Sequence, residues 1–347
     1  MKNDMDLAAL MAAPAADAAQ EAGVLVQHAA QCRIRSGLAA ILVPSERRAG
    51  NPTTGGRPRP ASRFIRSRVA RSALVRQQLF EALMPFGDLL PVPPGTHLVA
   101  GETDALLVAN APDIWRVLSD MGGMAQYEAR IEWDPLASLA TARAHAGVPE
   151  IRARVGEGRL ALGRRVAEAV ADLAERLGAD IAREIGRVAV DTIHLPRPDD
   201  RSPAALAVLV RREDEVLLER ALEAVETWGL AEPRIRLIGP SPPVSFAVVA
   251  LERPDARDVR AARRLLGMND AETNADRAFR MSLDRVAEDA DLARLRAARD
   301  LVRQLGAARE RLEAAGLAGP APLVVFRRDD QAVGRSEEHT SELQSRM

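Results

Sequence analysis

The sequence predicts an α+β protein with two small mixed domains followed by a C-terminal helical extension. Three observations predict this class. Short β-rich runs alternate with amphipathic helical patterns through short links. A long helical stripe of apolar residues opens a second mixed segment near residue 151. The chain has 347 residues, of which 47% are apolar and 28% charged, and this length suits two modest domains.

Both ends of the chain are expected to lie outside these domains. Residues 1–21 are Ala-rich and interrupted by Pro14, so we interpret them as a disordered or frayed tail. Residues 335–347, RSEEHTSELQSRM, match the in-frame translation of a common sequencing-adapter DNA. We therefore interpret them as an adapter-derived artefact and assign no chemistry to His339.

Residues 22–150 are predicted to form the N-terminal α+β domain. The runs 23–29 and 37–45 are short and β-rich, and the second stops at Pro44. Residues 46–72 are rich in Gly, Pro and Arg, and we expect a mobile basic loop there. The elements expected after the loop are a helix from about Ser72 to the residue before Pro85, a short strand and turn at 88–96, a helical pattern broken at Pro112 and a half-buried strand at 127–133.

Residues 151–252 are predicted to form the C-terminal α+β domain. Its first helix carries apolar residues at three- and four-residue steps, namely Val166, Val170, Leu173, Leu177, Ile181, Ile185 and Val188. A strand at 204–212, a helix from about 213 to 228 and a strand, loop and strand over 234–251 follow. This order resembles most of a ferredoxin-like half sheet, and we expect sheets of this kind in the two domains.

A proline-rich loop separates the last two of these runs. Proline has no amide hydrogen and holds φ near one value, so Pro240, Pro242 and Pro243 should form a stiff connection. We expect the loop at 239–244 to fix the register of a hairpin. The residues expected to shape hairpins are Gly239, Pro240, Ser245 and, in the earlier turn, Gly95.

Residues 253–328 are predicted to form the helical extension. Their apolar residues fall in successive stripes, which predict two or three helices packed as a hairpin. The run PLVVFRR at 322–328 is compatible with a late edge strand.

The composition gives no support to a catalytic, cofactor or metal site. The single cysteine, Cys32, excludes an internal disulfide and a multi-thiolate metal site, and it suits a reducing cytoplasm. His28 beside Cys32, and Asp191 beside His194, are interpreted as structural residues because no further ligands or catalytic partners accompany them. No apolar run approaches the roughly 18–20 residues that span a bilayer. We therefore predict a cytoplasmic protein that is not an enzyme.

One basic run leaves an alternative function open. Its arginines, with no acidic residue before Glu81, are Arg57, Arg59, Arg63, Arg66, Arg68, Arg71 and Arg76. Such a run could neutralise phosphates, so a nucleic-acid-binding regulatory protein is the alternative. Only Phe64 is available there for base stacking, and the chain is only 3% aromatic. A solvated loop, or a contact with an acidic protein, is therefore the preferred interpretation.

Three stretches resemble gas vesicle accessory proteins of the F and L type. IRLIGPSPPVSF at 235–246 is similar to that family's Gly-Pro-x-Pro-Pro-Tyr-Ser-Phe sequence, with Val244 where the family usually has tyrosine. LLPVPPGT at 89–96 is similar to its Leu-Pro-Val-Arg-Phe-Gly-Thr, and IEW at 131–133 to its Val-Glu-Trp. The resemblance spans about residues 22–252 and leaves the predicted extension outside.

The resemblance implies an accessory role in building gas vesicles, the gas-filled protein shells that give bacteria buoyancy, with no enzymatic activity and no cofactor. It implies the small shell protein and other accessory proteins as partners, and a cytoplasmic location at the vesicle. We hypothesise binding by strand addition or by helix-in-groove packing. The candidate contact residues are Trp133, Pro242, Pro243, Val244 and Phe246. For Trp133 and Phe246, core packing is the alternative interpretation.

Overall fold

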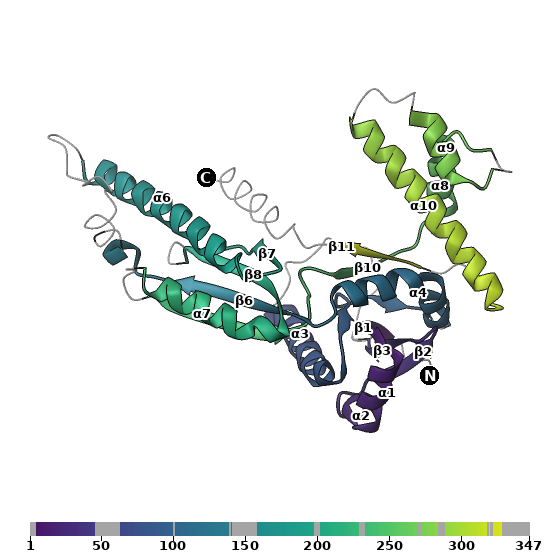
Figure 1. Cartoon of the computed structure of the whole chain (residues 1–347), viewed down its shortest axis with the longest axis horizontal. Helices are drawn as coiled ribbons and strands as arrows, with labels where there is room; N and C mark the ends of the chain where they lie inside the picture. The colour runs from purple at the N-terminus through teal and green to yellow at the C-terminus, as the bar shows by residue number, and fades with distance from the viewer. Residues whose placement is uncertain are drawn as a thin grey trace. The chain divides into compact units, whose positions relative to one another are not determined.

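The computed structural model divides the chain into two compact units (Figure 1). The first unit comprises Met1–Gly122 together with Val248–Arg327, and the second comprises Gly123–Ala247. The described residues are 5–45, 63–99, 101–138, 140, 158–197, 202–228, 233–269, 272–283, 289–317, 319 and 322–327, with the backbone alone described at 63–72 and 289–290.

The first unit is built on an antiparallel sheet. Its strands are β1 (Met5–Ala12), β2 (Gln31–Arg35), β3 (Leu38–Pro44), β4 (Leu89–Pro91) and β5 (His97–Leu98). The strand order is β2-β3-β1-β4, and β5 also pairs with β1. The first strand of the chain therefore lies in the centre of the sheet.

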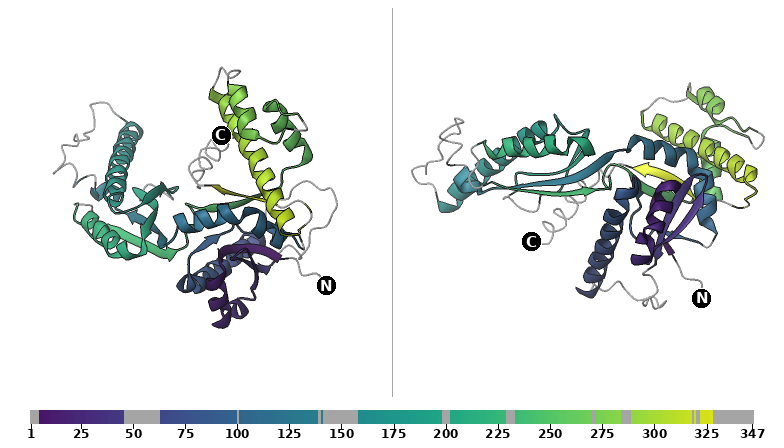
Figure 2. Two further views of the ribbon diagram at one scale, coloured as in Figure 1. Left: turned by 45° about the vertical axis from the view of Figure 1, so that its right-hand side comes forward. Right: turned by 60° about the horizontal axis from the view of Figure 1, so that its bottom comes forward.

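Helices cover both sides of this sheet. They are α1 (Ala13–Glu21), α2 (Val24–Gln27), α3 (Arg63–Leu83), which continues into the 3-10 turn Met84–Phe86, and α4 (Glu102–Asp120). α1, α2 and α3 bury apolar side chains against β1 and β3, including Ala16, Leu79 and Leu83. α4 packs against β1, β2 and β3 from the other side (Figure 2). The order strand, helix, strand, strand, helix, strand, with β1 between β3 and β4, is that of a ferredoxin-like sheet.

The helical extension belongs to this first unit. β10 (Val248–Glu252) leads into it, and it contains α8 (Ala256–Leu265), α9 (Ala275–Ser282), α10 (Asp289–Ala314) and β11 (Leu323–Arg327). β10 and β11 pair as an antiparallel ribbon. One half of α10 packs on α8 and α9 through Leu266, Ala278 and Leu295, and its other half packs on α4 through Ala308 and Leu312.

The second unit repeats the ferredoxin-like arrangement. Its elements are β6 (Met124–Glu132), α6 (Arg159–Ile185), β7 (Asp191–His194), β8 (Ala204–Arg211), the 3-10 turn Arg212–Asp214, α7 (Glu215–Glu226) and β9 (Arg234–Ser241). The antiparallel strand order is β7-β8-β6-β9. α6 and α7 bury Ile181, Ile185, Leu218 and Leu222 against alternate residues of β6 and β8, so both helices cover one face of the sheet. The expected fold class is confirmed.

The expected N-terminal tail is wrong. Residues 5–12 of the range 1–21 form the central strand β1, and residues 13–21 form α1. The side chains from Leu7 to Met11 in β1 are fully buried, because helices pack on both sides of the strand. This tertiary burial overrides the helical preference of an Ala-rich run.

Two local predictions in the next segment also fail. Residues 23–29 are not a strand, because α2 occupies Val24–Gln27 and β2 starts only at Gln31. α3 begins at Arg63 and not near residue 72, so the last ten residues of the expected loop 46–72 are helical. Residues 46–62 and 335–347 lie outside the described residues.

The predicted domain boundaries at 150 and 252 are wrong as well. β6 pairs with β8 and β9, so the second unit starts at Gly123. β10 pairs with β11, and the chain re-enters the first unit at Val248. The sequence patterns predicted these strands and helices, but a local pattern does not predict which strand pairs with which.

Two glycines of α6 provide a matched test of packing in the second unit. A Cβ at Gly178 would lie 2.6 Å from the carbonyl oxygen of Pro203, whereas a Cβ at Gly163 would meet nothing within 4 Å. We expect Gly178→Ala to lower the free energy of unfolding by about 1–3 kcal/mol through overpacking. We expect Gly163→Ala to raise it by about 0.5–1 kcal/mol, since alanine favours a helix interior. Urea unfolding of both variants measures the difference, and equal effects would contradict the close contact of α6 with residue 203.

Candidate partner-binding site

The proline-rich segment connects the two units and does not close a hairpin. β9 pairs with β6 in the second unit, whereas β10 pairs with β11 in the first. The expected hairpin is therefore wrong, together with the hairpin-shaping role of Gly239, Pro240 and Ser245. These residues instead hold the last part of β9 and the following turn against β6.

Gly239 lies where β9 passes closest to β6. Its φ is +147°, and a Cβ there would lie 2.7 Å from Cδ1 of Tyr127 and 2.9 Å from the carbonyl oxygen of Gln126. Only glycine fits both this backbone conformation and this distance. The Gly239–Pro240 peptide bond is cis. Tyr127 itself is fully buried, and burial together with the Glu215 carboxylate raises the pKa of its hydroxyl.

Gln126 of β6 clamps the turn that follows β9. Its side chain is 1% exposed. Its Oε1 accepts the backbone N–H of Ser245 at 2.8 Å, and its Nε2 donates to Ser245 Oγ at 3.1 Å. Its backbone carbonyl accepts the hydroxyl of Ser241 at 3.1 Å. Sequence reasoning missed Gln126, which lies directly before the predicted strand 127–133; a glutamine buried beside a strand needs hydrogen-bond partners for its amide.

The turn itself is wound tightly by three backbone hydrogen bonds. The N–H of Val244 donates to Pro242 O at 2.7 Å, and those of Phe246 and Ala247 donate to Pro243 O at 3.1 and 3.0 Å. Val244 lies in this turn and is 39% exposed. Pro242 and Pro243 are buried and Phe246 is half-buried.

Trp133 lies directly after β6 and is only 4% exposed. Burial favours the core-packing interpretation of this tryptophan. Among the five candidate contact residues, Val244 is the one that is exposed, and a contact role for the set stays a prediction.

Gly95 also lies away from a hairpin. β4 and β5 do not pair with each other; both pair with β1, at its two ends. The intervening residues form a bulge in which Gly95 has φ +79° and Thr96 Oγ1 donates to Pro93 O at 2.7 Å. The hairpin-shaping role expected for Gly95 is wrong, and the glycine instead permits this bulge along the edge of β1.

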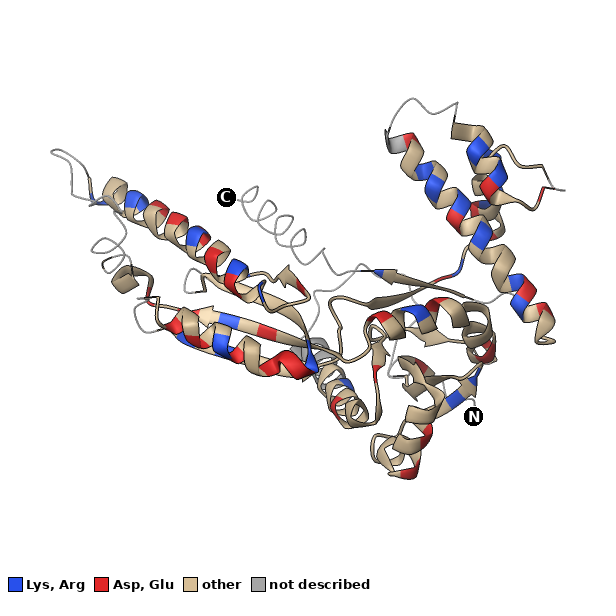
Figure 3. Ribbon diagram, in the orientation of Figure 1, with Lys and Arg blue, Asp and Glu red and all other residues tan. Residues whose placement is uncertain are grey.

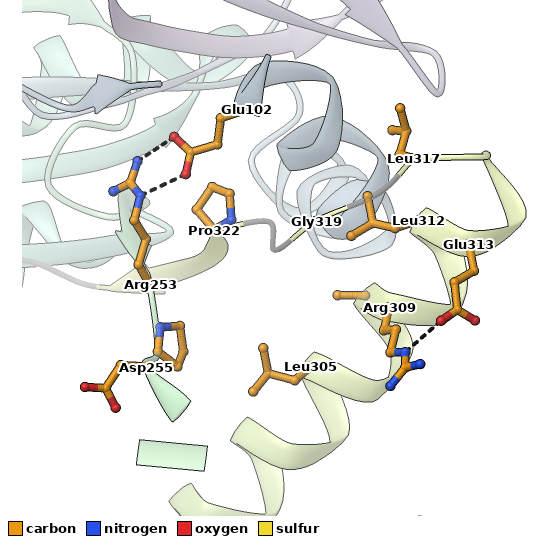
Figure 4. Close-up of a pocket in the computed structure, with 12 residues that line it drawn as sticks. Glu102, Arg253, Asp255, Leu305, Arg309, Leu312, Glu313, Leu317, Gly319 and Pro322 are labelled. Atoms are coloured by element: carbon orange, nitrogen blue, oxygen red, sulfur yellow. Dashed lines mark hydrogen bonds and ion pairs between the residues drawn. The ribbon is translucent and has the colours of Figure 1, made fainter. Parts of the chain in front are cut away.

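A cavity of about 760 Å³ lies within the first unit (Figure 4). Apolar residues of α10 and of the following segment point into it, including Leu305, Leu312, Leu317 and Pro322. Figure 4 shows one ion pair on each side of the cavity, between Arg253 and Glu102 and between Arg309 and Glu313. The cavity has the size and the apolar walls of a binding cleft.

The Arg253–Glu102 pair fixes the start of α4 to the end of β10. Arg253 donates from Nε and Nη2 to the two carboxylate oxygens of Glu102 at 2.9 Å, and from Nη2 to His97 O at 2.9 Å. Burial opposes ionisation of Glu102, but the hydrogen bonds from Arg253 and from the N–H of Val99 outweigh it and lower the pKa of the carboxyl. The hydrogen bond that Arg253 donates to Glu102 in turn raises the pKa of Arg253.

The described part of the chain gives little support to other chemistry. It contains no group of three or more His, Cys, Asp or Glu side chains placed to hold a metal ion. None of its helices combines the length and apolarity needed to cross a membrane.

One arginine of the basic run is not available to bind nucleic acid. Arg76 is buried and donates to Val92 O at 2.8 Å and to Leu7 O at 3.3 Å, so it holds α3 to the sheet. Charges of both signs alternate along α6, α7 and α10 (Figure 3). The side chains of the other six arginines lie outside the described residues, so this alternative is untested.

The family model of gas vesicle synthesis protein GvpL/GvpF matches residues 11–248 of the chain. This match covers the second unit, the first unit from Met11 to Gly122, and the whole proline-rich segment. The chain belongs to the GvpL/GvpF family. It is therefore a gas vesicle accessory protein, and the resemblance seen in the sequence is confirmed.

Two solved structures of GvpF are similar to this fold. The crystal structure of GvpF from Anabaena sp. PCC7120 superimposes with a TM-score of 0.50 at 16% identity, covering 70% of this chain and 94% of that protein. GvpF from Microcystis aeruginosa superimposes with a TM-score of 0.47 at 15% identity, covering 71% of this chain and 99% of that protein. No curated protein matches the sequence at a significant level. The GvpL/GvpF match ends at the first residue of β10, so α8, α9, α10 and β11 lie outside it.

Gln126 offers a direct test of how the proline-rich turn is held. Gln126→Leu keeps the volume but leaves the N–H of Ser245 without its acceptor, so we expect a loss of about 1–3 kcal/mol in the free energy of unfolding. Ser245→Ala removes only the Oγ contact and should cost about 1 kcal/mol or less. Hydrogen exchange at the amide of residue 245 should be faster in Gln126→Leu alone. Unchanged exchange there would contradict the clamp.

The lowered pKa of Glu102 leads us to expect that the stability of the chain depends on pH. Its pKa in the folded chain lies below the ordinary value of 4.5, so its stabilising contribution is full above that pH and is lost as the pH falls through the lowered pKa. Glu102→Gln should therefore cost about 1 kcal/mol at pH 7, and this deficit should shrink below pH 4.5. Asp104→Asn, which removes a more exposed ion pair with Arg35, is the control and should cost less than about 0.5 kcal/mol. A deficit of Glu102→Gln that persists at pH 3 would contradict the assignment.

Proposed function

We propose that this chain is a non-enzymatic adaptor of gas vesicle assembly that binds the small shell protein, other accessory proteins, or both, in the cytoplasm at the growing vesicle. Its membership of the GvpL/GvpF family supports the gas vesicle role and the absence of a catalytic role. The way in which it binds is argued from the second unit.

The observation that carries the binding mode is the edge position of β9. β9 is eight residues long and stands at the end of the strand order β7-β8-β6-β9. Within the described residues, no strand pairs with its outer side. An edge strand of this length offers backbone groups to which a partner can add a strand.

Side chains along this edge limit what can bind. Ile238 is 38% exposed, and the turn that continues from β9 exposes Val244. Arg234 and Arg236 are also exposed. Charged edge residues discourage unselective pairing, and these two arginines favour an acidic neighbour over a basic one. The edge therefore suits an extended partner segment that combines apolar and acidic side chains.

Pro240 sets one end of the pairing region. It has no amide hydrogen, so a ladder that runs along β9 from Arg234 stops before this residue. The clamp of Gln126 on Ser245 then holds Val244 in a fixed position beyond the end of the ladder. A rigid contact costs less entropy on binding than a flexible loop would.

A pair of substitutions tests this proposal. Ile238→Asp places a charge on the β9 edge, and we expect capture of the co-expressed shell protein or accessory proteins to fall at least tenfold, which corresponds to about 1.4 kcal/mol. Val216→Asp, on α7 of the same unit, changes an aliphatic side chain that is 53% exposed and should leave capture unchanged. Thermal unfolding of both variants controls for stability.

Two results would contradict the proposal. Failure of the unaltered chain to capture any co-expressed gas vesicle protein would contradict the adaptor function. Equal capture by Ile238→Asp and Val216→Asp would keep an adaptor but remove the β9 edge from its interface.

A further inference from the structure

A buried asparagine on α4 binds the backbone of β11 as a neighbouring strand would. Asn110 is 3% exposed. Its Nδ2 donates to Pro322 O at 2.9 Å and to Leu106 O of its own helix at 2.8 Å, and its Oδ1 accepts the N–H of Val324 at 2.9 Å. One carboxamide thus satisfies a carbonyl and an amide that lie two residues apart on an extended segment.

The other side of β11 is held by β10. Five residue pairs join the two strands, from Val248 opposite Arg327 to Glu252 opposite Leu323. Arg327 and Glu252 also form an ion pair. β10 and Asn110 therefore form the two walls of a slot for an extended segment, which we call the β11 slot.

On α4, the apolar contact with this region is made by Ala105, Val108 and Ala109. They cluster with buried Ala308, Leu312 and Leu323, and partly buried leucines of the extension pack against this cluster, namely Leu301, Leu305 and Leu317. The cavity of about 760 Å³ lies beside this contact, between α10 and the start of α4. This cavity opens to solvent, so α10 and the start of α4 are not in close contact across it.

Polar contacts supply much of the remaining attachment. Besides the Asn110 bonds, Arg311 of α10 donates from Nε to Ala109 O at 2.9 Å. Pro112 in α4 has no N–H, so the carbonyl of Val108 lacks its helical donor, and the next carbonyl, that of Ala109, accepts the bond from Arg311. Segments held by few apolar contacts open at lower free energy than core elements do.

One wall of the slot differs from its occupant in relation to the family. Asn110 and all of α4 lie within the part that matches GvpL/GvpF, whereas β11, and β10 beyond Val248, lie outside it. The strand that fills the slot is therefore supplied by a segment that the family model does not include.

We propose that the β11 slot is a second docking site, for an extended apolar segment of a gas vesicle protein, and that β11 occupies it within the chain until the partner's segment replaces it. The identity of the partner rests on the proposed function; the slot itself does not. Strand addition at β10 with Asn110 as the second wall is the recognition mode. With a site on each unit, the chain would join two partner segments.

A peptide displacement experiment tests the slot without any gas vesicle protein. The probe is a fluorescent peptide of residues 319–328, and the protein is the full chain carrying Val324→Pro, which removes the N–H that Asn110 accepts and loosens the chain's own β11. We expect the probe to bind this variant at least tenfold more tightly than the unaltered chain. A probe that itself carries Val324→Pro is the matched control and should not bind.

Asn110→Ala in the Val324→Pro chain should abolish the gain in probe binding, and circular dichroism of each variant establishes that it remains folded. Probe affinity equal in the unaltered and Val324→Pro chains would overturn the slot, as would full probe binding to the Asn110→Ala chain.

The partner is tested by capture of co-expressed gas vesicle proteins. We expect the Val324→Pro chain to capture several-fold more partner than the unaltered chain. We expect this capture to fall again when the probe peptide is added. Both results together support replacement of β11 by the partner's segment. Probe binding without any rise in capture would overturn replacement by a partner. It would leave the adaptor function standing, because that function is tested separately at β9.

Discussion

Each unit is organised around its first strand, which lies in the centre of the sheet and bonds on both edges. β1 bonds β3 on one edge and β4 and β5 on the other, and β6 bonds β8 and β9. These partners come from later in the chain, so neither sheet closes before its whole unit is made. The central strands therefore determine where the helices pack and which strands are left at the edges.

The features that identify the family gather around these two strands. LLPVPPGT supplies β4 and the bulge before β5, beside β1, and IEW lies at the end of β6. The proline-rich stretch ends β9 and is held on β6 by Gln126 and by the close approach of Gly239 to Tyr127. These motifs lie against or at the ends of the central strands, whereas the exposed β9 edge, with Ile238 and the neighbouring Val244, carries the binding hypothesis.

Sequence patterns identified many elements but not the partners of the strands. The apolar stripe of α6, the helices of the extension and the late strand β11 are all present near their expected positions. β1 was missed because MDLAALMA has the composition of a helix and becomes a strand only through burial between two neighbours. β9 and β10 were recognised as strands, but their pairing with β6 and β11 depends on contacts that no local pattern contains. The roles of Gln126 and Asn110 were not predicted for the same reason, since the backbone groups that they bind in other elements lie 119 and more than 200 residues away.

The central claim is that partner segments add to the outer edge of β9. The most direct measurement is hydrogen exchange of the backbone amides of residues 234–238, made on the chain alone and on its complex with the co-expressed shell protein or accessory proteins. Strand addition predicts that these amides are selectively protected in the complex, while those of α7 on the covered face of the same sheet are unchanged. Unchanged exchange along β9 in a complex that demonstrably forms would contradict the account.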